Sequence, residues 1–96
     1  IESDYFPARY GGEEFIIIMP DTSKEAGRQF AESLRRTIEK HLFPGKDQPL
    51  QITASFGVAS FDHNKPITKE DFIEHVDRAM YNAKHSGRNK VAVFNE

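Results

Sequence analysis

The sequence predicts an α/β domain in which helices pack on a mixed sheet. A pair of glycines stands between two strand-like segments near the start of the chain, which indicates an antiparallel hairpin. Two amphipathic helical patterns follow, and each begins with a capping sequence. Further strand-like segments lie at 50–60 and 90–94, so helices and strands alternate, as they do in layered α/β domains.

Length and composition limit the classes of function. The 96 residues are one small domain at most. A net charge of −2 gives no electrostatic reason to expect nucleic acid or a membrane surface as a partner. The absence of cysteine excludes disulfides, thiolate metal sites and cysteine nucleophiles, and the four histidines have no metal-ligand spacing. No apolar run approaches the ~20 residues of a spanning helix. We expect the segment to be cytoplasmic, whether or not the parent protein is anchored in a membrane.

The first predicted element is a hairpin with strands at 8–10 and 15–19. Gly11 and Gly12 can adopt the positive φ of a tight turn without strain. The second strand is uniformly apolar, as expected of a strand that is covered on both faces. Glu13 and Glu14 lie at the tip beside backbone amides, where a metal-bound phosphate could rest. A purely structural explanation is that these are solvated turn residues.

The first helix is predicted to begin with a capping box, in which Thr22 and Glu25 each bond the other's backbone amide. It is predicted to stop at Pro44 and Gly45. One stripe of the helix is apolar at every fourth residue, and it comprises Ala26, Phe30, Leu34 and Ile38. Such a stripe indicates core packing rather than a cofactor site.

The segment 50–60 alternates with a period of two and predicts a single strand. Its apolar face comprises Leu50, Ile52, Ala54, Phe56 and Val58. Its other face comprises the smaller residues Thr53, Ser55, Gly57 and Ala59. A backbone or a bulky group must therefore approach this second face closely. We favour a packed helix over a bound ligand as the explanation.

The second helix is predicted to begin at Thr68, again as a cap, and to end before Gly87. Its apolar positions are Phe72, Ile73, Val76, Ala79, Met80 and Ala83. Basic residues gather where the helix ends. They would stabilise the negative end of the helix dipole, which is a sufficient structural explanation. Alternatively, Lys84 and Arg88 neutralise the phosphate oxygens of a nucleotide that is held over the hairpin tip.

Four segments together resemble the GGDEF family, the diguanylate cyclases. The first contains Gly-Gly-Glu-Glu-Phe, a common form of the signature, and the segments are 9–15, 53–59, 77–81 and 81–89, in the family's order. The resemblance implies that residues 1–96 are the C-terminal part of a single GGDEF domain. It implies a nucleotidyl-cyclase palm-like fold with a ferredoxin-like core, here lacking the first central strand and that strand's metal-binding aspartate. We therefore expect this chain alone to be an inactive fragment.

The implied reaction condenses two GTP molecules into cyclic di-GMP, a bacterial second messenger in signal transduction, and releases pyrophosphate. The residues that the resemblance implicates are Gly11, Gly12, Glu13, Glu14, Lys84 and Arg88. Glu13 would bind Mg²⁺ or Mn²⁺ and help to activate the attacking hydroxyl, with Glu14 as a second acidic group. The two glycines would let the nucleotide approach the backbone, and the two cations would contact its triphosphate.

The resemblance also implies partners: the substrate GTP, a second GGDEF domain in a homodimer and an upstream sensory domain. Many members carry an Arg-x-x-Asp site for product inhibition before the signature. Neither Asp4 nor Tyr5 has an arginine three residues upstream, so we expect no such site. Two other functions stay open. One is a degenerate GGDEF module that binds GTP or a partner domain in a regulatory role. The other is an RNA-binding module, which the acidic balance disfavours.

Overall fold

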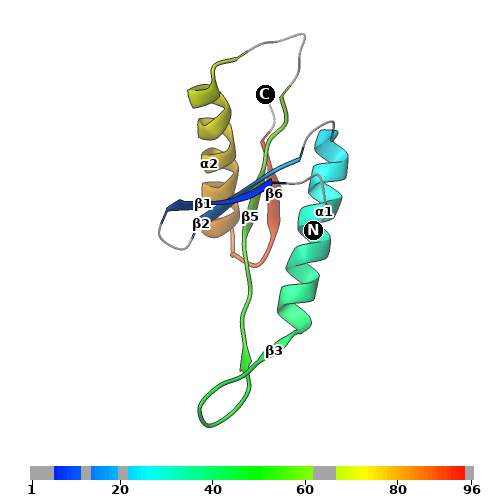
Figure 1. Ribbon diagram of the computed structural model, residues 1–96, viewed down its shortest axis with the longest axis vertical. Helices are drawn as coiled ribbons and strands as arrows, with labels where there is room; N and C mark the ends of the chain where they lie inside the picture. Colours follow the sequence, from blue (N-terminus) through cyan, green and yellow to red (C-terminus); the bar gives the residue numbers. More distant parts are fainter. Residues whose placement is uncertain (1–5, 12–13, 20–21, 62–66, 95–96) are drawn as a thin grey trace.

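The computed structural model of the chain describes residues 6–11, 14–19, 22–61 and 67–94 (Figure 1). The elements are β1 (Phe6–Gly11), β2 (Glu14–Ile18), α1 (Lys24–Lys40), β3 (Leu42–Phe43), β4 (Leu50–Gln51), β5 (Phe56–Val58), α2 (Lys69–His85) and β6 (Val91–Val93). This order of strands and helices confirms the predicted α/β class.

The described strands form three separate pairs rather than one continuous sheet. β1 and β2 form an antiparallel hairpin, β3 and β4 form a second antiparallel pair, and β5 runs parallel to β6. The predicted mixture of strand directions is confirmed. Among the described strands, no ladder joins the β1–β2 hairpin to the β5–β6 pair.

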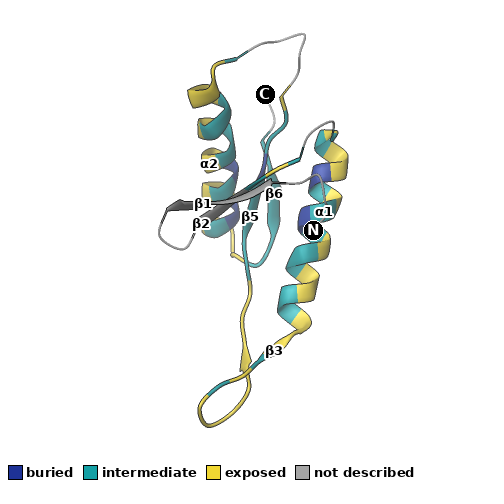
Figure 2. Cartoon of the chain, viewed as in Figure 1, coloured by how far each residue is buried: buried dark blue, intermediate teal, exposed yellow. Residues whose placement is uncertain are grey.

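Both helices pack on the β5–β6 pair, and the residues buried at these contacts are small (Figure 2). They are Gly27 and Ala31 of α1, Val58 of β5, and Ala79 and Ala83 of α2. The closest approach is at Gly57, where a Cβ atom would lie 2.3 Å from the Met80 nitrogen and 2.7 Å from the Val76 oxygen. The prediction that a helix packs on the small-residue face of this strand is therefore confirmed.

Helix α1 begins one residue later than the sequence predicted. Its N-cap is Ser23 rather than Thr22, and the Ser23 Oγ accepts a hydrogen bond from the Ala26 N–H at 3.1 Å. This start places Glu25 at the second helical position, one residue too early for a capping box. The Glu25 carboxylate instead accepts hydrogen bonds from Arg28.

The end of α1 and its apolar stripe also differ from the prediction. The helix ends at Lys40, ahead of Pro44, because the chain becomes extended at His41 and enters β3 directly. Ala26, which was predicted in the apolar stripe, is exposed, whereas its neighbour Gly27 is buried. The side of α1 that packs on the β5–β6 pair therefore differs from the predicted stripe, and its buried residues are Gly27 and Ala31.

The predicted strand at 50–60 is interrupted. β4 pairs with β3, β5 pairs with β6, and residues 52–55 belong to neither pair. Leu50 and Ile52 belong to the predicted apolar face but are 50% and 48% exposed. The reason is that β3 and β4 lie beyond the ends of both helices, as Figure 1 shows, where no helix covers them. Val58 is buried, as predicted.

Helix α2 follows the prediction. The Thr68 Oγ1 accepts a hydrogen bond from the Asp71 N–H at 3.0 Å, which confirms this residue as the N-cap. The helix ends at His85, and Gly87 follows with a φ of 121°, as expected of a left-handed residue after a helix. In the described part of the chain, neither helix is long and apolar enough to cross a bilayer.

Candidate functional site

The predicted acidic hairpin is present, and the structure places its strands. Gly11 pairs with Glu14 across β1 and β2, after a register shift that begins at Arg9. Gly11 is therefore the last residue of a strand rather than part of the turn, and Glu14 is the first residue of the next strand. Gly12 and Glu13 connect these strands and lie outside the described residues, so the metal and catalytic roles predicted for Glu13 remain predictions.

The basic cluster lies where α2 ends, as predicted. Lys84 is in the last turn and half-buried, and Arg88 follows the helix and is exposed. The Arg88 N–H donates a hydrogen bond to the Ala83 carbonyl at 3.0 Å, the long-range bond of a Schellman motif. The backbone is left-handed over three successive residues, with φ of 121° at Gly87, 60° at Arg88 and 50° at Asn89.

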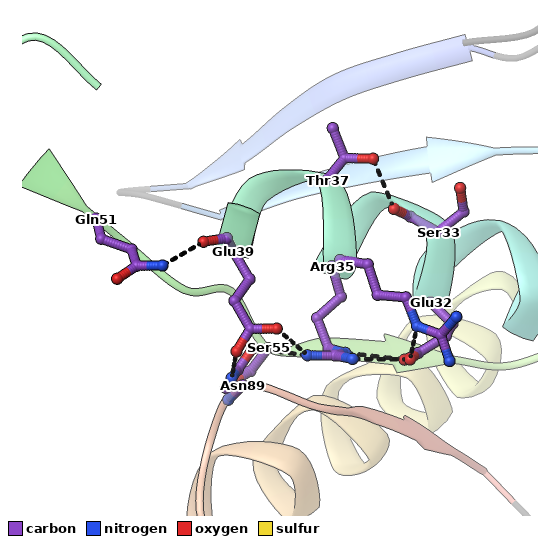
Figure 3. Close-up of polar contacts among 9 residues, drawn as sticks. Glu32, Ser33, Arg35, Thr37, Glu39, Gln51, Ser55 and Asn89 are labelled. Atoms are coloured by element: carbon purple, nitrogen blue, oxygen red, sulfur yellow. Dashed lines mark hydrogen bonds and ion pairs between the residues drawn. The ribbon is translucent and has the colours of Figure 1, made fainter. Parts of the chain in front are cut away.

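A polar cluster that the sequence did not predict lies next to this turn (Figure 3). Arg35 and Glu39 project from α1 toward Asn89, and the three side chains form a closed ring of contacts. Arg35 Nη1 lies 3.0 Å from Asn89 Oδ1 and 3.2 Å from Glu39 Oε1, and Asn89 Nδ2 lies 2.7 Å from Glu39 Oε2. The Asn89 N–H also donates to Ser55 Oγ at 3.1 Å, just before β5.

Hydrogen bonds among these side chains and their neighbours on α1 shift the pKa values of the charged groups. Hydrogen bonds from Arg35 and Arg36 lower the pKa of Glu32 to about 2. A hydrogen bond from Asn89, followed by one from Arg35, lowers the pKa of Glu39. The same carboxylates raise the pKa of Arg35 above its ordinary value. Arg35 therefore stays charged at any accessible pH, and both carboxylates stay ionised at neutral pH.

The donor chemistry of the hairpin fits a divalent cation. Glu13 and Glu14 offer carboxylate oxygens, and Mg²⁺ is usually held by one or two carboxylates together with the phosphates of its substrate. Within the described ranges, no three His, Asp or Glu side chains gather closely enough to hold a metal ion.

Comparison with known proteins places this geometry in a family. The family profile described as "Diguanylate cyclase, GGDEF domain" matches residues 1–90. Among curated proteins, the diguanylate cyclase DgcP of Pseudomonas aeruginosa is 46% identical over 88 residues, which cover 92% of this chain and 13% of that protein. The chain therefore spans only a small part of this relative.

Two solved structures match the fold. The active GGEEF domain of a diguanylate cyclase from Vibrio cholerae is 33% identical with a TM-score of 0.88, and the match covers 100% of this chain and 60% of that one. The GGDEF domain of DgcB from Caulobacter crescentus, in complex with c-di-GMP, is 28% identical with a TM-score of 0.87, over 99% and 56% of the two chains. The expectation of a partial cyclase palm fold is thus confirmed. The chain belongs to the GGDEF family of diguanylate cyclase domains.

Proposed function

We propose that the protein is a diguanylate cyclase, which condenses two GTP molecules into cyclic di-GMP and releases pyrophosphate. The main observation in support of this proposal is that this chain, a member of the family, has both an acidic glycine hairpin and a basic turn at the end of α2. The hairpin offers the carboxylates that a metal ion needs, and the turn offers cations for a triphosphate. Family membership and the identity of 46% to a protein named diguanylate cyclase support the same activity.

At the hairpin, we assign metal binding to Glu13, with Glu14 as a second acidic group. A bound Mg²⁺ or Mn²⁺ would lower the pKa of the attacking 3′-hydroxyl and neutralise charge on the phosphates. Gly11 and Gly12 leave room for the nucleotide to approach the backbone, because neither carries a side chain. The carboxylates of the hairpin would thus hold the ion.

At the end of α2, we assign triphosphate binding to Lys84 and Arg88. A helix C-terminus carries a partial negative charge and repels phosphate, so an anion can be held there only if cations offset that charge. Arg88 follows the helix and is exposed, which leaves its planar guanidinium accessible for two parallel hydrogen bonds to phosphate oxygens. Lys84, one turn earlier, adds a second positive charge.

The reaction requires two GTP molecules, and we propose that each is held by a separate GGDEF domain in a homodimer. An upstream sensory domain would control the pairing. The chain covers 60% of the solved Vibrio cholerae domain, and we propose that the segment described here is inactive without the rest of the domain.

The test is to incubate the full-length protein with GTP and Mg²⁺ and to quantify cyclic di-GMP. We expect product from the wild type and a loss of at least about 100-fold in rate for Glu13→Ala, because a metal ligand is removed. Glu74→Ala is the control, since Glu74 is an exposed carboxylate of α2 that pairs with Arg78. We expect its rate to be unchanged. Equal rates for the two variants would overturn the assignment of Glu13.

The alternative function is a regulatory module that binds GTP or a partner domain without turnover. The complete signature, from Gly11 to Phe15, and the presence of both cations disfavour it. It would be supported if the wild-type protein bound GTP but formed no cyclic di-GMP with Mg²⁺ or with Mn²⁺.

A further inference from the structure

We infer that Asn89 is a positioning residue, which fixes the backbone of Arg88 for contact with the triphosphate, and that Arg35 and Glu39 of α1 hold Asn89 in place. This inference rests on the proposed function. It assigns a role in substrate binding to α1, a helix whose apolar stripe predicts core packing alone.

The turn after α2 has a backbone that needs external support. Arg88 and Asn89 have positive φ although neither is glycine. The left-handed conformation brings Cβ close to the carbonyl oxygen of the same residue, so two successive non-glycine residues adopt it only where their surroundings hold them there. The positions of Arg88 and its guanidinium therefore depend on contacts from outside the turn.

Asn89 supplies those contacts with its side-chain amide and its backbone N–H. Its Oδ1 accepts from Arg35, its Nδ2 donates to Glu39, and its backbone N–H donates to Ser55. An amide side chain suits this place, because it presents an acceptor to a cation and a donor to an anion at the same time. Aspartate would place a second negative charge against Glu39, and alanine would leave both partners without the bond. Asparagine also tolerates left-handed backbone better than most residues.

The partners of Asn89 are themselves held in place. Arg35 forms a bidentate pair with Glu32, with both N–O distances at 2.8 Å, and its side chain is only 15% exposed. The Glu39 carbonyl accepts a hydrogen bond from Gln51 at 2.8 Å. Figure 3 shows these side chains arranged along one side of α1, next to the turn. Asn89 is thus anchored to a helix that is packed on the β5–β6 pair.

Hydrogen bonds hold the backbone on both sides of Arg88. On its N-terminal side, its own N–H is bonded to Ala83. On its C-terminal side, Asn89 is held by α1, and the Lys90 carbonyl accepts from the Phe56 N–H at 2.9 Å. Loss of the Asn89 side chain would remove the contacts with Arg35 and Glu39 and leave the backbone hydrogen bonds on both sides of Arg88 intact. The expected consequence is a misplaced guanidinium rather than an unfolded domain.

The test is a double-mutant cycle on the full-length protein, with Arg88→Ala, Asn89→Ala and the double variant. The readout is the dissociation constant of a non-hydrolysable GTP analogue, measured calorimetrically with Mg²⁺. We expect each single variant to bind about 10-fold more weakly or worse, the scale of one hydrogen bond to a charged group. If Asn89 acts through Arg88, the double variant binds no more weakly than Arg88→Ala alone.

Two further variants separate positioning from general stability. Asn89→Gly keeps the freedom to adopt positive φ but removes the amide, so we expect it to fold and to bind the analogue as weakly as Asn89→Ala. Arg36→Ala is the matched control, because Arg36 also bonds Glu32 but is not part of the ring with Asn89. We expect its affinity for the analogue to be unchanged.

The possible failures are distinguishable. Additive losses in the double variant, or unchanged binding by both variants of Asn89, would overturn this inference and leave the proposed function intact. Unchanged binding by Arg88→Ala, or no binding by the wild type, would overturn the assignment of the turn to the triphosphate and this inference with it.

Discussion

Helices α1 and α2 have the same length, yet they are held to the β5–β6 pair in different ways. α2 makes a close backbone contact, since Gly57 leaves no room for a Cβ atom beside Met80. α1 stands further away: a Cβ atom at Gly27 would meet Met19 and Val58 side chains at 3.5 Å, an ordinary contact distance. α1 adds the polar ring with Asn89, which reaches the turn at the end of α2.

This difference shows that close packing and hydrogen bonds hold two different parts of the molecule, the helix α2 and the turn that follows it. Close packing fixes the axis of α2, but it cannot fix a turn that lies beyond the last residue of that helix. Hydrogen bonds from α1 reach that turn directly, with defined partners and directions. Close packing therefore holds α2, which carries Lys84, and hydrogen bonds from α1 hold Asn89 in the turn that carries Arg88.

The largest expected effect on stability is at Gly57. The Gly57→Ala substitution would force its new methyl group against the α2 backbone, which cannot yield as a flexible side chain can. We expect the free energy of unfolding to fall by about 3 kcal/mol, at the upper end of the usual cost of overpacking. Chemical denaturation of the full-length protein measures this. A loss below ~1 kcal/mol would show that α2 is not held by this close contact.

The matched substitution on the other helix should have a smaller effect of opposite sign. At Gly27 the added methyl group has room, and alanine favours a helix over glycine by about 1 kcal/mol. Gly27→Ala should therefore raise the free energy of unfolding by about 0.5–1 kcal/mol, measured in the same denaturation series. A decrease in the free energy of unfolding would mean that α1 packs as tightly as α2, which would contradict the difference between the two helices.

The remaining expected effect is a dependence of the stability on pH that involves Glu32. Its pKa is about 2 in the folded protein, below its ordinary value of 4.5, so folding is favoured where the group is ionised. This contribution is fully present above about pH 4.5 and is lost as the pH falls toward 2. In Glu32→Gln, the free energy of unfolding should fall less steeply between pH 5 and pH 2.5 than in the wild type. Equal slopes of the free energy of unfolding against pH in the two proteins would show that Glu32 does not contribute to this pH dependence.

The sequence predicted those features that depend on local pattern. The Thr68 cap and the buried face of α2 follow from residue types at helical spacing, and the small residue Gly57 correctly indicated a packed helix. The predicted start of α1 was wrong by one residue, because Thr22 and Ser23 are both good N-cap residues and the sequence does not decide between them.

Features that depend on distant partners were not predictable. The break after Gln51 arises because β4 pairs with β3, and two-residue strands leave no clear alternation in a sequence. The bond between Arg35 and Asn89 joins residues that are 54 positions apart. One local signal did exist: asparagine shortly after the glycine that ends a helix is a residue type that tolerates positive φ.

The most direct test of the account is amide hydrogen exchange in the full-length Arg35→Ala protein, followed by mass spectrometry. Arg35→Ala breaks the ring at Asn89, and Arg36→Ala serves as the control. We predict faster exchange in peptides that cover residues 86–90, unchanged exchange in those that cover the middle of α2, and wild-type behaviour in the control. Unchanged exchange at 86–90, or a uniform increase along α2, would contradict the claim that α1 fixes this turn separately from the packing of α2.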